Sequence, residues 1–451
     1  MSSGIKKSLI ALTLSGLFAA PSAFATNGYF AHGYSTKEKA LAGAGVAHSQ
    51  DAMAVANNPA GIAGMGERMD VGAAVFAPFR SYTVTGAPTQ GCQAPGQCTF
   101  SLAEGTEDSN MNYFLIPHFA YNWKLDSDSS MALALYGNGG MNTNYKGGSA
   151  TFSVDGTNGG FQTFPGTFGD GTTGVNLAQL FVNLSYGTKL NENHSVGASL
   201  VFAYQTFEAI GLKNFGGMST DPANLSRNGA DSSMGFGVKL GWQGKVAPAV
   251  TLGASYQSKM SMSEFEKYAG LFAEGGDFDI PATATVGISW ETSKSSTLVF
   301  DVQSIYYSKV ASIANPVAPL IDGSCQATPT GGNGTGCLGG SAGAGFGWED
   351  MTVYKLGYEW GNDITWRVGV SSGKQPIPST ETMFNILAPA VMQTHLTFGM
   401  TLPMGANSEI SLAGLYAPSN SVSGTSPFDP AQEIEIEMVQ YEIQGTYSMK
   451  F

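Results

Sequence analysis

The sequence predicts an all-β fold: an exported, 14-stranded antiparallel transmembrane β-barrel with an N-terminal hatch in its lumen. Three observations support this prediction: a secretory signal, strands in which apolar and polar residues alternate, and short turns that alternate with long loops. Only 12% of the 451 residues are charged, against about 25% in an average soluble domain. After the signal, no apolar run reaches the ~18 residues of a membrane helix, whereas alternating strands hide their hydrophobicity from such a count.

Residues 1–25 have the features of a signal peptide. Lys6 and Lys7 precede an apolar run from Leu9 to Ala20, and Ala23-Phe24-Ala25 is a small-residue cleavage site. The mature chain is therefore expected to begin near Thr26. The formal net charge of −13 becomes more negative once both lysines are removed, which argues against a nucleic-acid partner and against a polybasic lipid-binding surface.

Residues 26–66 are predicted to form the hatch. The segment is rich in Ala and Gly, has few large apolar residues, and ends in the turn-like run Asn57-Asn58-Pro59-Ala60-Gly61. Such a segment cannot build a core alone, so we expect it to lie inside the barrel formed by residues 67–451.

The barrel prediction depends on its turns. Six short polar turns join twelve strands, and the first and last strands bring the number to fourteen, an even number as in bacterial outer-membrane barrels. Short turns at one end and long loops at the other, the last of them expected from Pro418 to Gln432, are also typical of these barrels. The turns are Asp126-Ser127-Asp128-Ser129, Asn191-Glu192-Asn193, Ala247-Pro248, Ser293-Lys294-Ser295, Gly361-Asn362-Asp363 and Gly405-Ala406-Asn407-Ser408.

The last strand shows the alternation most clearly. Tyr441, Ile443 and Phe451 fall on one face, which we expect to contact lipid, and Gln440 and Glu442 fall on the other. A soluble β-sandwich also alternates. Long strands, aromatic strand ends and a consistent polarity of turns and loops favour the barrel.

One strand departs from the pattern. In Met131 to Tyr145, the run Gly137-Asn138-Gly139-Gly140 interrupts the alternation. Glycine within a strand often marks a bulge or bend. The interruption is therefore either a frayed strand end or a kink that opens the barrel wall.

Several long loops carry apolar side chains, among them Phe215, Phe265 and Phe272. Exposed apolar groups of this kind mark binding surfaces, although packing of loop on loop explains them equally well. The four cysteines form two close pairs, Cys92 with Cys98 and Cys325 with Cys337, within loops. Two local disulfides are expected in an exported chain, and neither pair has metal-ligand spacing.

Two stretches, around Ser341 and Ser371, match the G-x-S-x-G pattern of serine hydrolases, but neither has the strand-turn-helix context of a nucleophile elbow. The five histidines have no metal-ligand spacing, so we expect no enzyme, cofactor or metal. Lys239, Lys355 and Arg367 fall on the polar phase of their strands. Such lumen cations either pair with other lumen charges and tie down the hatch, or bind a ligand carboxylate.

Several of these stretches together resemble the FadL/TodX (OmpP1) family of outer-membrane transporters of hydrophobic compounds. They are Thr26-Asn27-Gly28-Tyr29, Gly43-Ala44-Gly45, Asn58-Pro59-Ala60, the strand Tyr136 to Tyr145 and the terminal Phe451.

The resemblance implies a monomer in the outer membrane of a Gram-negative bacterium, a hatched barrel and a kink in the third strand at Gly137, Gly139 and Gly140. Loops Gly211 to Asp231 and Glu264 to Asp277 would capture the ligand, which would pass Asn27, Gly28, Tyr29 and Phe30 and leave sideways into lipid.

The expected function is passive uptake of hydrophobic molecules. Long-chain fatty acids are the first candidates, and aromatic hydrocarbons or alkanes are next. A fatty acid needs a cation in the apolar pocket, whereas a hydrocarbon does not. An outer-membrane hydrolase and a general porin are remote alternatives.

Overall fold

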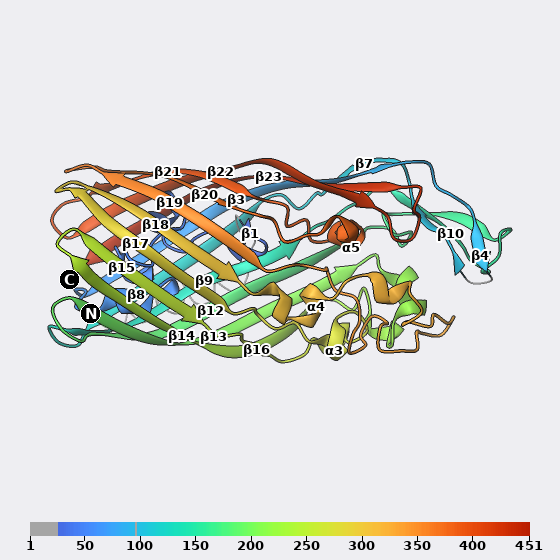
Figure 1. The fold of residues 1–451 in the computed structure, drawn as a ribbon, viewed down its shortest axis with the longest axis horizontal. Coiled ribbons are helices and arrows are strands. Elements are labelled where there is room, and N and C mark those ends of the chain that lie inside the picture. The colour runs from blue at the N-terminus through green and yellow to red at the C-terminus, as the bar shows by residue number, and fades with distance from the viewer. Residues whose placement is uncertain (1–25, 95–96) are drawn as a thin grey trace, which may run out of the picture.

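Fourteen antiparallel strands pair side by side in the computed structural model of the chain, which describes residues 26–94 and 97–451. The last strand pairs with the first along its whole length, from Lys450 opposite Arg68 to Glu433 opposite Thr85. This pairing closes the sheet into the predicted barrel (Figure 1). The barrel strands are β3 (Arg68–Thr85), β8 (Phe114–Lys124), β9 (Ser129–Asn142), β12 (Gly174–Lys189), β13 (His194–Ile210), β14 (Asp231–Ala247), β15 (Val250–Gln257), β17 (Thr283–Ser293), β18 (Ser296–Ile305), β19 (Met351–Trp360), β20 (Thr365–Gly373), β21 (Thr394–Pro403), β22 (Ser408–Thr425) and β23 (Glu433–Lys450).

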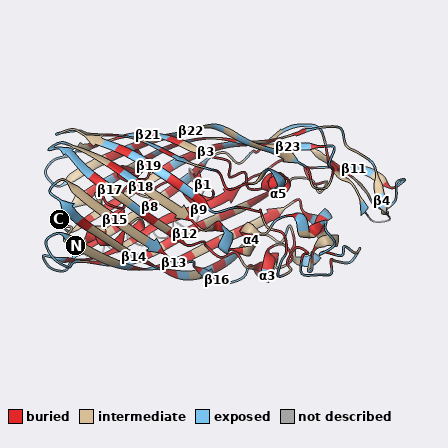
Figure 2. Cartoon of the chain, in the orientation of Figure 1, coloured by how far each residue is buried: buried red, intermediate tan, exposed pale blue. Residues whose placement is uncertain are grey.

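Side chains alternate between lumen and outer surface along the strands, as the bands of buried and exposed residues in Figure 2 show. In β23, Ile443 is 70% exposed, whereas Gln440 and Glu442 are buried, and Phe451, directly after the strand, is 65% exposed. The outer surface is therefore apolar and the lumen polar. This confirms the strand faces expected from the sequence.

The two ends of the barrel differ in the length of their connections. Short turns join the strands at one end, and seven segments at the other end are named L1 (86–113), L2 (143–173), L3 (211–230), L4 (258–282), L5 (306–350), L6 (374–393) and L7 (426–432). They carry short elements of their own, namely β4 (Cys92–Ala94), β5 (Gln97–Cys98), β6 (Phe100–Leu102), β7 (Gly105–Asp108), β10 (Ser149–Ser153), β11 (Phe161–Pro165), η3 (Lys213–Met218), η4 (Pro222–Asn224), β16 (Ser261–Met262), η5 (Glu266–Tyr268), α3 (Ala273–Gly276), η6 (Tyr307–Lys309), α4 (Ala311–Ala314), η7 (Ala318–Leu320), η8 (Ser379–Glu381) and α5 (Thr382–Asn385). Within the described residues, no helix is long and apolar enough to cross a membrane.

One expected loop is mostly strand. The sequence predicts a loop over 418–432, yet β22 and β23 continue to pair from Asn420 opposite Met438 to Thr425 opposite Glu433. The run Ser419 to Gly424 lacks large alternating apolar residues because this part of the hairpin projects beyond the main body of the barrel (Figure 1). Only its inward face needs apolar residues, and β23 supplies them.

Residues 26–66, which keep the name hatch below, are largely buried and contact the barrel wall, for example at Trp242 and Lys239 of β14. The elements of the hatch are β1 (Thr26–Asn27), β2 (Phe30–Ala31), α2 (Thr36–Ala40), η1 (Ala52–Ala56) and η2 (Pro59–Ile62), and nearly all of their residues are buried. Ser35 caps α2, since its side chain accepts a hydrogen bond from Lys37 N. The predicted signal peptide lies outside the described residues.

Both cysteine pairs are joined as disulfides. Cys92–Cys98 links β4 to β5 in L1, and Cys325–Cys337 closes part of L5. L1 and L2 together form an extension that projects farthest from the barrel, and the first disulfide lies near its tip (Figure 1).

Candidate functional site

The C-terminal end of the hatch is held by the side chain of Asn58. Its Nδ2 donates to Val46 O (2.7 Å) and to Trp242 O of β14 (3.0 Å). Its Oδ1 accepts from Ala60 N (3.0 Å), which caps η2. Pro59 begins η2, where a missing N–H is tolerated. This amide therefore fixes both the local turn and its contact with the wall.

Glycines in the wall make room for this turn. A Cβ on Gly241 would lie 1.9 Å from Asn58 Oδ1, and a Cβ on Gly197 would lie 2.3 Å from Pro59 C. Any larger residue at either position would push the hatch away from β13 and β14.

Two of the predicted lumen cations contact the hatch backbone. Lys239 Nζ donates to Ala56 O. Lys355 Nζ lies 3.3 Å from both His32 O and Gly43 O. The side chains of both lysines are thus engaged in holding the hatch.

The third predicted cation, Arg367, forms an ion pair with Glu359 (Nε to Oε2, 2.6 Å). Glu359 also meets His48 of the hatch at 3.4 Å. A further ion pair joins Lys39 of α2 to Glu442 of β23. The hatch is therefore bound to the wall by charges as well as by hydrogen bonds.

The N-terminal end of the hatch is held mainly through its backbone. Tyr307 OH, from L5, donates to Asn27 O (2.6 Å) and accepts from Tyr29 N (3.2 Å). Gln440 of β23 bonds to the backbone N of Thr26 (3.2 Å) and to its hydroxyl (2.9 Å). Asn27 is 1% exposed, and neither of its side-chain amide atoms has a hydrogen-bond partner.

The wall is interrupted between β8 and β9. Their ladder stops at Phe119 opposite Leu135, although both strands continue. At the same register Pro117 would face Gly137, and proline has no N–H to donate. On its other side, the pairing of β9 with β12 skips Asn138 as a bulge. The structure thus places the irregularity within the glycine-rich run.

The hatch covers this interruption. Residues 134–143 are all buried, whereas an ordinary barrel strand exposes every second residue. The unpaired edge of β9 receives β2 instead of β8, with Phe30 opposite Gly139 and a hydrogen bond from Gly140 N to Tyr29 O (3.2 Å). A Cβ on Gly139 would lie 2.0 Å from Tyr29 O. Glycine at this position therefore permits the hatch to approach.

An apolar cavity lies beneath the long loops and is called the upper cavity here. Of the predicted ligand-path residues, Phe215 and Phe272 line it, and Phe265 packs behind Phe272 with ring centroids 5.9 Å apart. The other lining side chains are also mostly apolar: Val175, Phe207, Leu212, Leu271, Leu338, Ala344, Phe346, Phe384 and Leu387.

A second cavity, the lower cavity, lies at the N-terminal end of the hatch. Thr26 and Gly28 line it, together with residues of β3, β9, β23, L5 and L6. Rings lead from one cavity to the other, from Phe272 through Phe278 (4.8 Å) and Tyr29 (6.2 Å) to Trp348 (6.0 Å). Tyr29 thus connects the linings of the two cavities, and Phe30 pairs with β9 at the interruption in the wall.

Arg80 of β3, which was not among the residues predicted from the sequence, lines the lower cavity. Its side chain is 6% exposed, and its terminal nitrogens donate to Asn142 O and Met111 O. Its Nε has no hydrogen-bond partner, and no carboxylate in the described part of the chain forms an ion pair with it. The only signal in the sequence was that Arg80 falls on the inward-facing phase of β3. Several other charged residues hold the same kind of position on their strands, so this signal did not single it out.

Ser371 is buried between two histidines. His32 Nε2 lies 2.8 Å from its hydroxyl and His395 Nδ1 3.3 Å. Among the described residues, no carboxylate is hydrogen-bonded to either ring, so this contact joins the hatch to the wall and lacks the acid of a catalytic triad. Ser341 lies exposed in L5.

Comparison with known proteins agrees with this architecture. A family model described as outer membrane protein transport protein (OMPP1/FadL/TodX) matches residues 16–427. No curated protein matches the sequence.

Solved structures share the fold at low sequence identity. The Pseudomonas putida toluene transporter TodX is 18% identical, with 93% of this chain and 99% of that chain covered and a TM-score of 0.64. The Ralstonia pickettii toluene transporter TbuX is 16% identical, over 93% and 99%, with a TM-score of 0.59. A Pseudomonas aeruginosa FadL homologue is 12% identical, over 94% and 100%, with a TM-score of 0.60. With the family model matching most of its length, the chain belongs to the OMPP1/FadL/TodX family of outer-membrane transport proteins.

Proposed function

We propose that this outer-membrane barrel takes up long-chain fatty acids by passive diffusion. The ligand enters the upper cavity, follows the rings past Tyr29 into the lower cavity, and leaves through the wall between β8 and β9. The family supports transport of hydrophobic compounds across the outer membrane. The choice of a fatty acid depends on the polar group that the lower cavity offers.

Arg80 carries this choice. A buried cation without an opposing charge is costly, because backbone carbonyls replace only part of the water it has lost. A carboxylate in the lower cavity would supply the missing charge and accept a hydrogen bond from the free Nε. Lys239, Lys355 and Arg367 are already engaged by the hatch or by Glu359, so we assign the carboxylate to Arg80 in their place.

The lateral exit has a physical reason. An alkyl chain gains about 0.8 kcal/mol per CH₂ group on leaving water. The lumen beneath the cavities is filled by the hatch and its polar contacts, whereas the interruption beside β9 adjoins the lower cavity. Displacing β2 from β9 would connect this cavity to the membrane without exposing the chain to water.

An aromatic hydrocarbon is the second candidate. Several structural neighbours are toluene transporters, and another is a monoaromatic hydrocarbon channel, CymD. The ring path from Phe272 to Trp348 would also suit a flat ring. A neutral hydrocarbon gains nothing from Arg80, and this difference separates the two candidates.

The test compares oleate and toluene uptake by cells that express the wild type, Arg80→Met or Arg80→Lys. Cells that express Arg80→Met should take up oleate about 10- to 100-fold more slowly than wild-type cells, because the variant cannot form charge-assisted hydrogen bonds to the carboxylate. Toluene uptake should not fall, and Arg80→Lys should recover part of the oleate uptake. Equal loss for both ligands, or none for oleate, would contradict the assignment.

Two further measurements address the remote alternatives. A general porin would give a large ion conductance in a planar bilayer, whereas a hatched barrel should conduct little. A hydrolase would lose esterase activity on Ser371→Ala or Ser341→Ala.

Deletion of residues 27–34 should change uptake if the N-terminal end of the hatch is the gate.

A further inference from the structure

The extension formed by L1 and L2 contains a three-stranded sheet in the order β11-β10-β6. Its register places Phe152 opposite Phe100, and Ala150 opposite both Phe164 and Leu102. Since alternate residues share a face, these apolar side chains lie together on one face of the sheet. The opposite face carries the polar side chains Ser101, Thr151, Ser153 and Thr163, together with Phe161.

Three rings on the apolar face form a continuous stack, which we call the phenylalanine ladder: Phe164, Phe152 and Phe100. Ring centroids are 4.9 Å apart at the first step and 5.2 Å at the second, and both pairs are stacked. All three rings are partly exposed to solvent. The next ring, Phe215, is 5.4 Å from Phe100 and lines the upper cavity. The ladder therefore leads from the projecting part of the molecule into the cavity.

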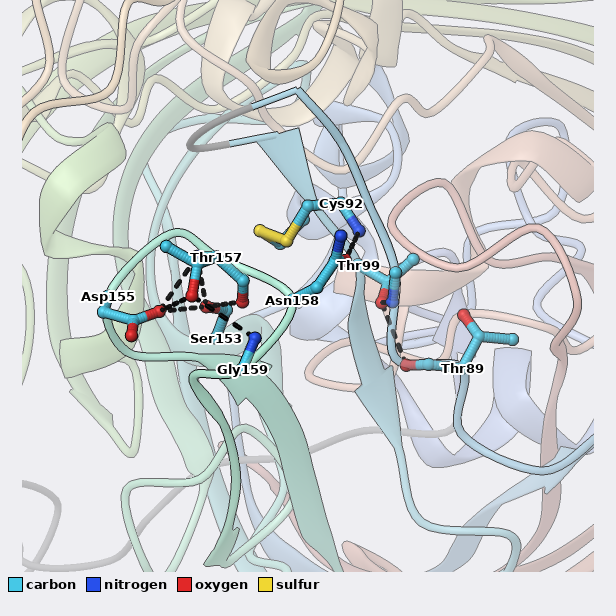
Figure 3. Close-up of a disulfide and its surroundings, with 10 residues drawn as sticks. Thr89, Cys92, Thr99, Ser153, Asp155, Thr157, Asn158 and Gly159 are labelled. Carbon is cyan, nitrogen blue, oxygen red and sulfur yellow. Dashed lines mark hydrogen bonds between the residues drawn. A yellow bond between two sulfur atoms is a disulfide. The ribbon is translucent and has the colours of Figure 1, made fainter.

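The ladder is held on a fixed support. Gln432 bonds to both backbone groups of Leu102 in β6, at 2.9 and 2.7 Å. At the tip, Asn158 Oδ1 accepts from Cys92 N (2.7 Å), so the disulfide hairpin is tied to the turn between β10 and β11 (Figure 3). Rings that are held in place lose little freedom when a ligand binds.

The composition of the extension limits what the ladder can bind. L1 and L2 contain a single basic residue, Lys146, close to the end of β9, and residues 86–110 and 147–172 contain no Lys or Arg and carry Glu104, Glu107, Asp108, Asp155 and Asp170. An anionic headgroup or phosphate would therefore meet mostly negative charge there. A strip one ring wide is also far smaller than the ~800 Å² that each partner buries in a stable protein interface. A small apolar molecule matches the strip in both size and chemistry.

We propose that the phenylalanine ladder is a capture site for the apolar part of the transported molecule, whether an alkyl chain or an aromatic ring. The molecule binds first at Phe164 or Phe152, moves to Phe100, and enters the upper cavity beside Phe215. Each contact is weak and similar to the next, so the molecule can move along the ladder without being trapped. This inference rests on the proposed function, because it assumes that the upper cavity receives the same ligand.

The first test measures initial uptake of radiolabelled oleate and toluene over a range of concentrations. In the double variant Phe152→Ser/Phe164→Ser, loss of ring contacts should lower the rate at limiting ligand about two- to tenfold, while the maximal rate stays unchanged. Phe161→Ser is the matched control, since Phe161 lies on the opposite face of β11. Wild-type rates of the double variant at every concentration would overturn the proposal.

A second test needs no transport and does not require the double variant to fold. Phe152→Trp and Phe161→Trp are compared in the purified protein by quenching of fluorescence with 9,10-dibromostearate. The added fluorescence of Phe152→Trp should be quenched at lower ligand concentrations than that of Phe161→Trp. Equal quenching would overturn the ladder even if uptake is normal. If the wild-type protein takes up neither ligand, the proposed function is contradicted. The quenching result still decides whether the ladder binds an apolar molecule, because it does not depend on transport.

Discussion

The two ends of the hatch each bury an asparagine, and the two side chains are held in opposite ways. Asn58 makes three hydrogen bonds through its side chain, one of them to the barrel wall. The amide of Asn27 is equally buried and makes none, while its own backbone depends on Tyr307 from a loop. An unsatisfied buried amide costs about 1–3 kcal/mol.

The difference indicates which end can move. The Asn58 end is satisfied locally and seated against wall glycines, so its release would break several bonds at once. The Asn27 end already bears an unsatisfied group, lines the lower cavity and covers the edge of β9. A ligand that offers new contacts to the Asn27 end therefore needs less free energy to displace it than it would need to displace the Asn58 end.

Asn58→Ala should give the largest effect. It removes all three hydrogen bonds of the Asn58 side chain, which we expect to destabilise the seated hatch by about 2–4 kcal/mol, although Val46 O still accepts from Gln243 (2.9 Å). Ion conductance in a planar bilayer should rise as the hatch loosens. Asn27→Ala, which removes an unsatisfied amide, should leave conductance unchanged. Similar conductance in the two variants would remove the contrast between the ends.

Tyr307→Phe should give a smaller effect, confined to the N-terminal end. It keeps the ring against Tyr29 and removes two hydrogen bonds, at a cost of about 1–2 kcal/mol. Hydrogen exchange, followed by mass spectrometry, should accelerate over residues 26–31 and stay unchanged over 57–62. Tyr306→Phe is the neighbouring control. If exchange over 26–31 does not respond, Tyr307 does not hold this end.

The smallest effect should come from pH. Burial, and then the neighbouring carboxylate of Asp279, raises the pKa of Asp277 in L4 to about 7. Folded L4 therefore holds a proton that the unfolded loop loses above its ordinary pKa. The stability of L4 should be greatest below that ordinary pKa, fall as the pH rises toward 7, and level off above it.

The protection of residues 271–280 from hydrogen exchange, corrected for the intrinsic pH dependence of amide exchange, should follow this course between pH 4 and 8. The loop adjoins the Asn27 end, because Phe278 of L4 contacts the ring of Tyr29. Asp277→Asn should flatten the pH dependence, and residues 57–62 should show none in either protein. If the protection of residues 57–62 also changed with pH, the two ends of the hatch would unfold together and not independently.

The barrel could be predicted because alternation and turns are local properties of the sequence. Ile443 and Gln440 reveal their faces by position alone, and each short turn carries its own polar residues. The end of β22 could not be recognised, since Ser419 to Gly424 meets no lipid and therefore has no apolar pattern.

The candidate site was less predictable because it depends on which groups the hatch meets. Lys239 and Lys355 look the same as Arg80 in sequence, and each falls on the inward phase of its strand. The path of the hatch backbone distinguishes them, since the hatch carbonyls Ala56 O and Gly43 O accept from the two lysines. Arg80 donates to Asn142 O and Met111 O, which lie outside the hatch, and its Nε has no partner. The phenylalanine ladder arises from pairing between L1 and L2, which no local pattern indicates.

The wall glycines have a consequence for how the protein is assembled. Gly197 and Gly241 leave space that Asn58, Pro59 and Ala60 fill, so the wall and the hatch turn complete each other's packing. The hatch joins the barrel at the closing seam, where Phe451 N donates to Glu67 O (3.0 Å). Biogenesis is therefore simplest when the hatch is seated against β13 and β14 before β3 meets β23, because a closed cylinder would have to be threaded from one end.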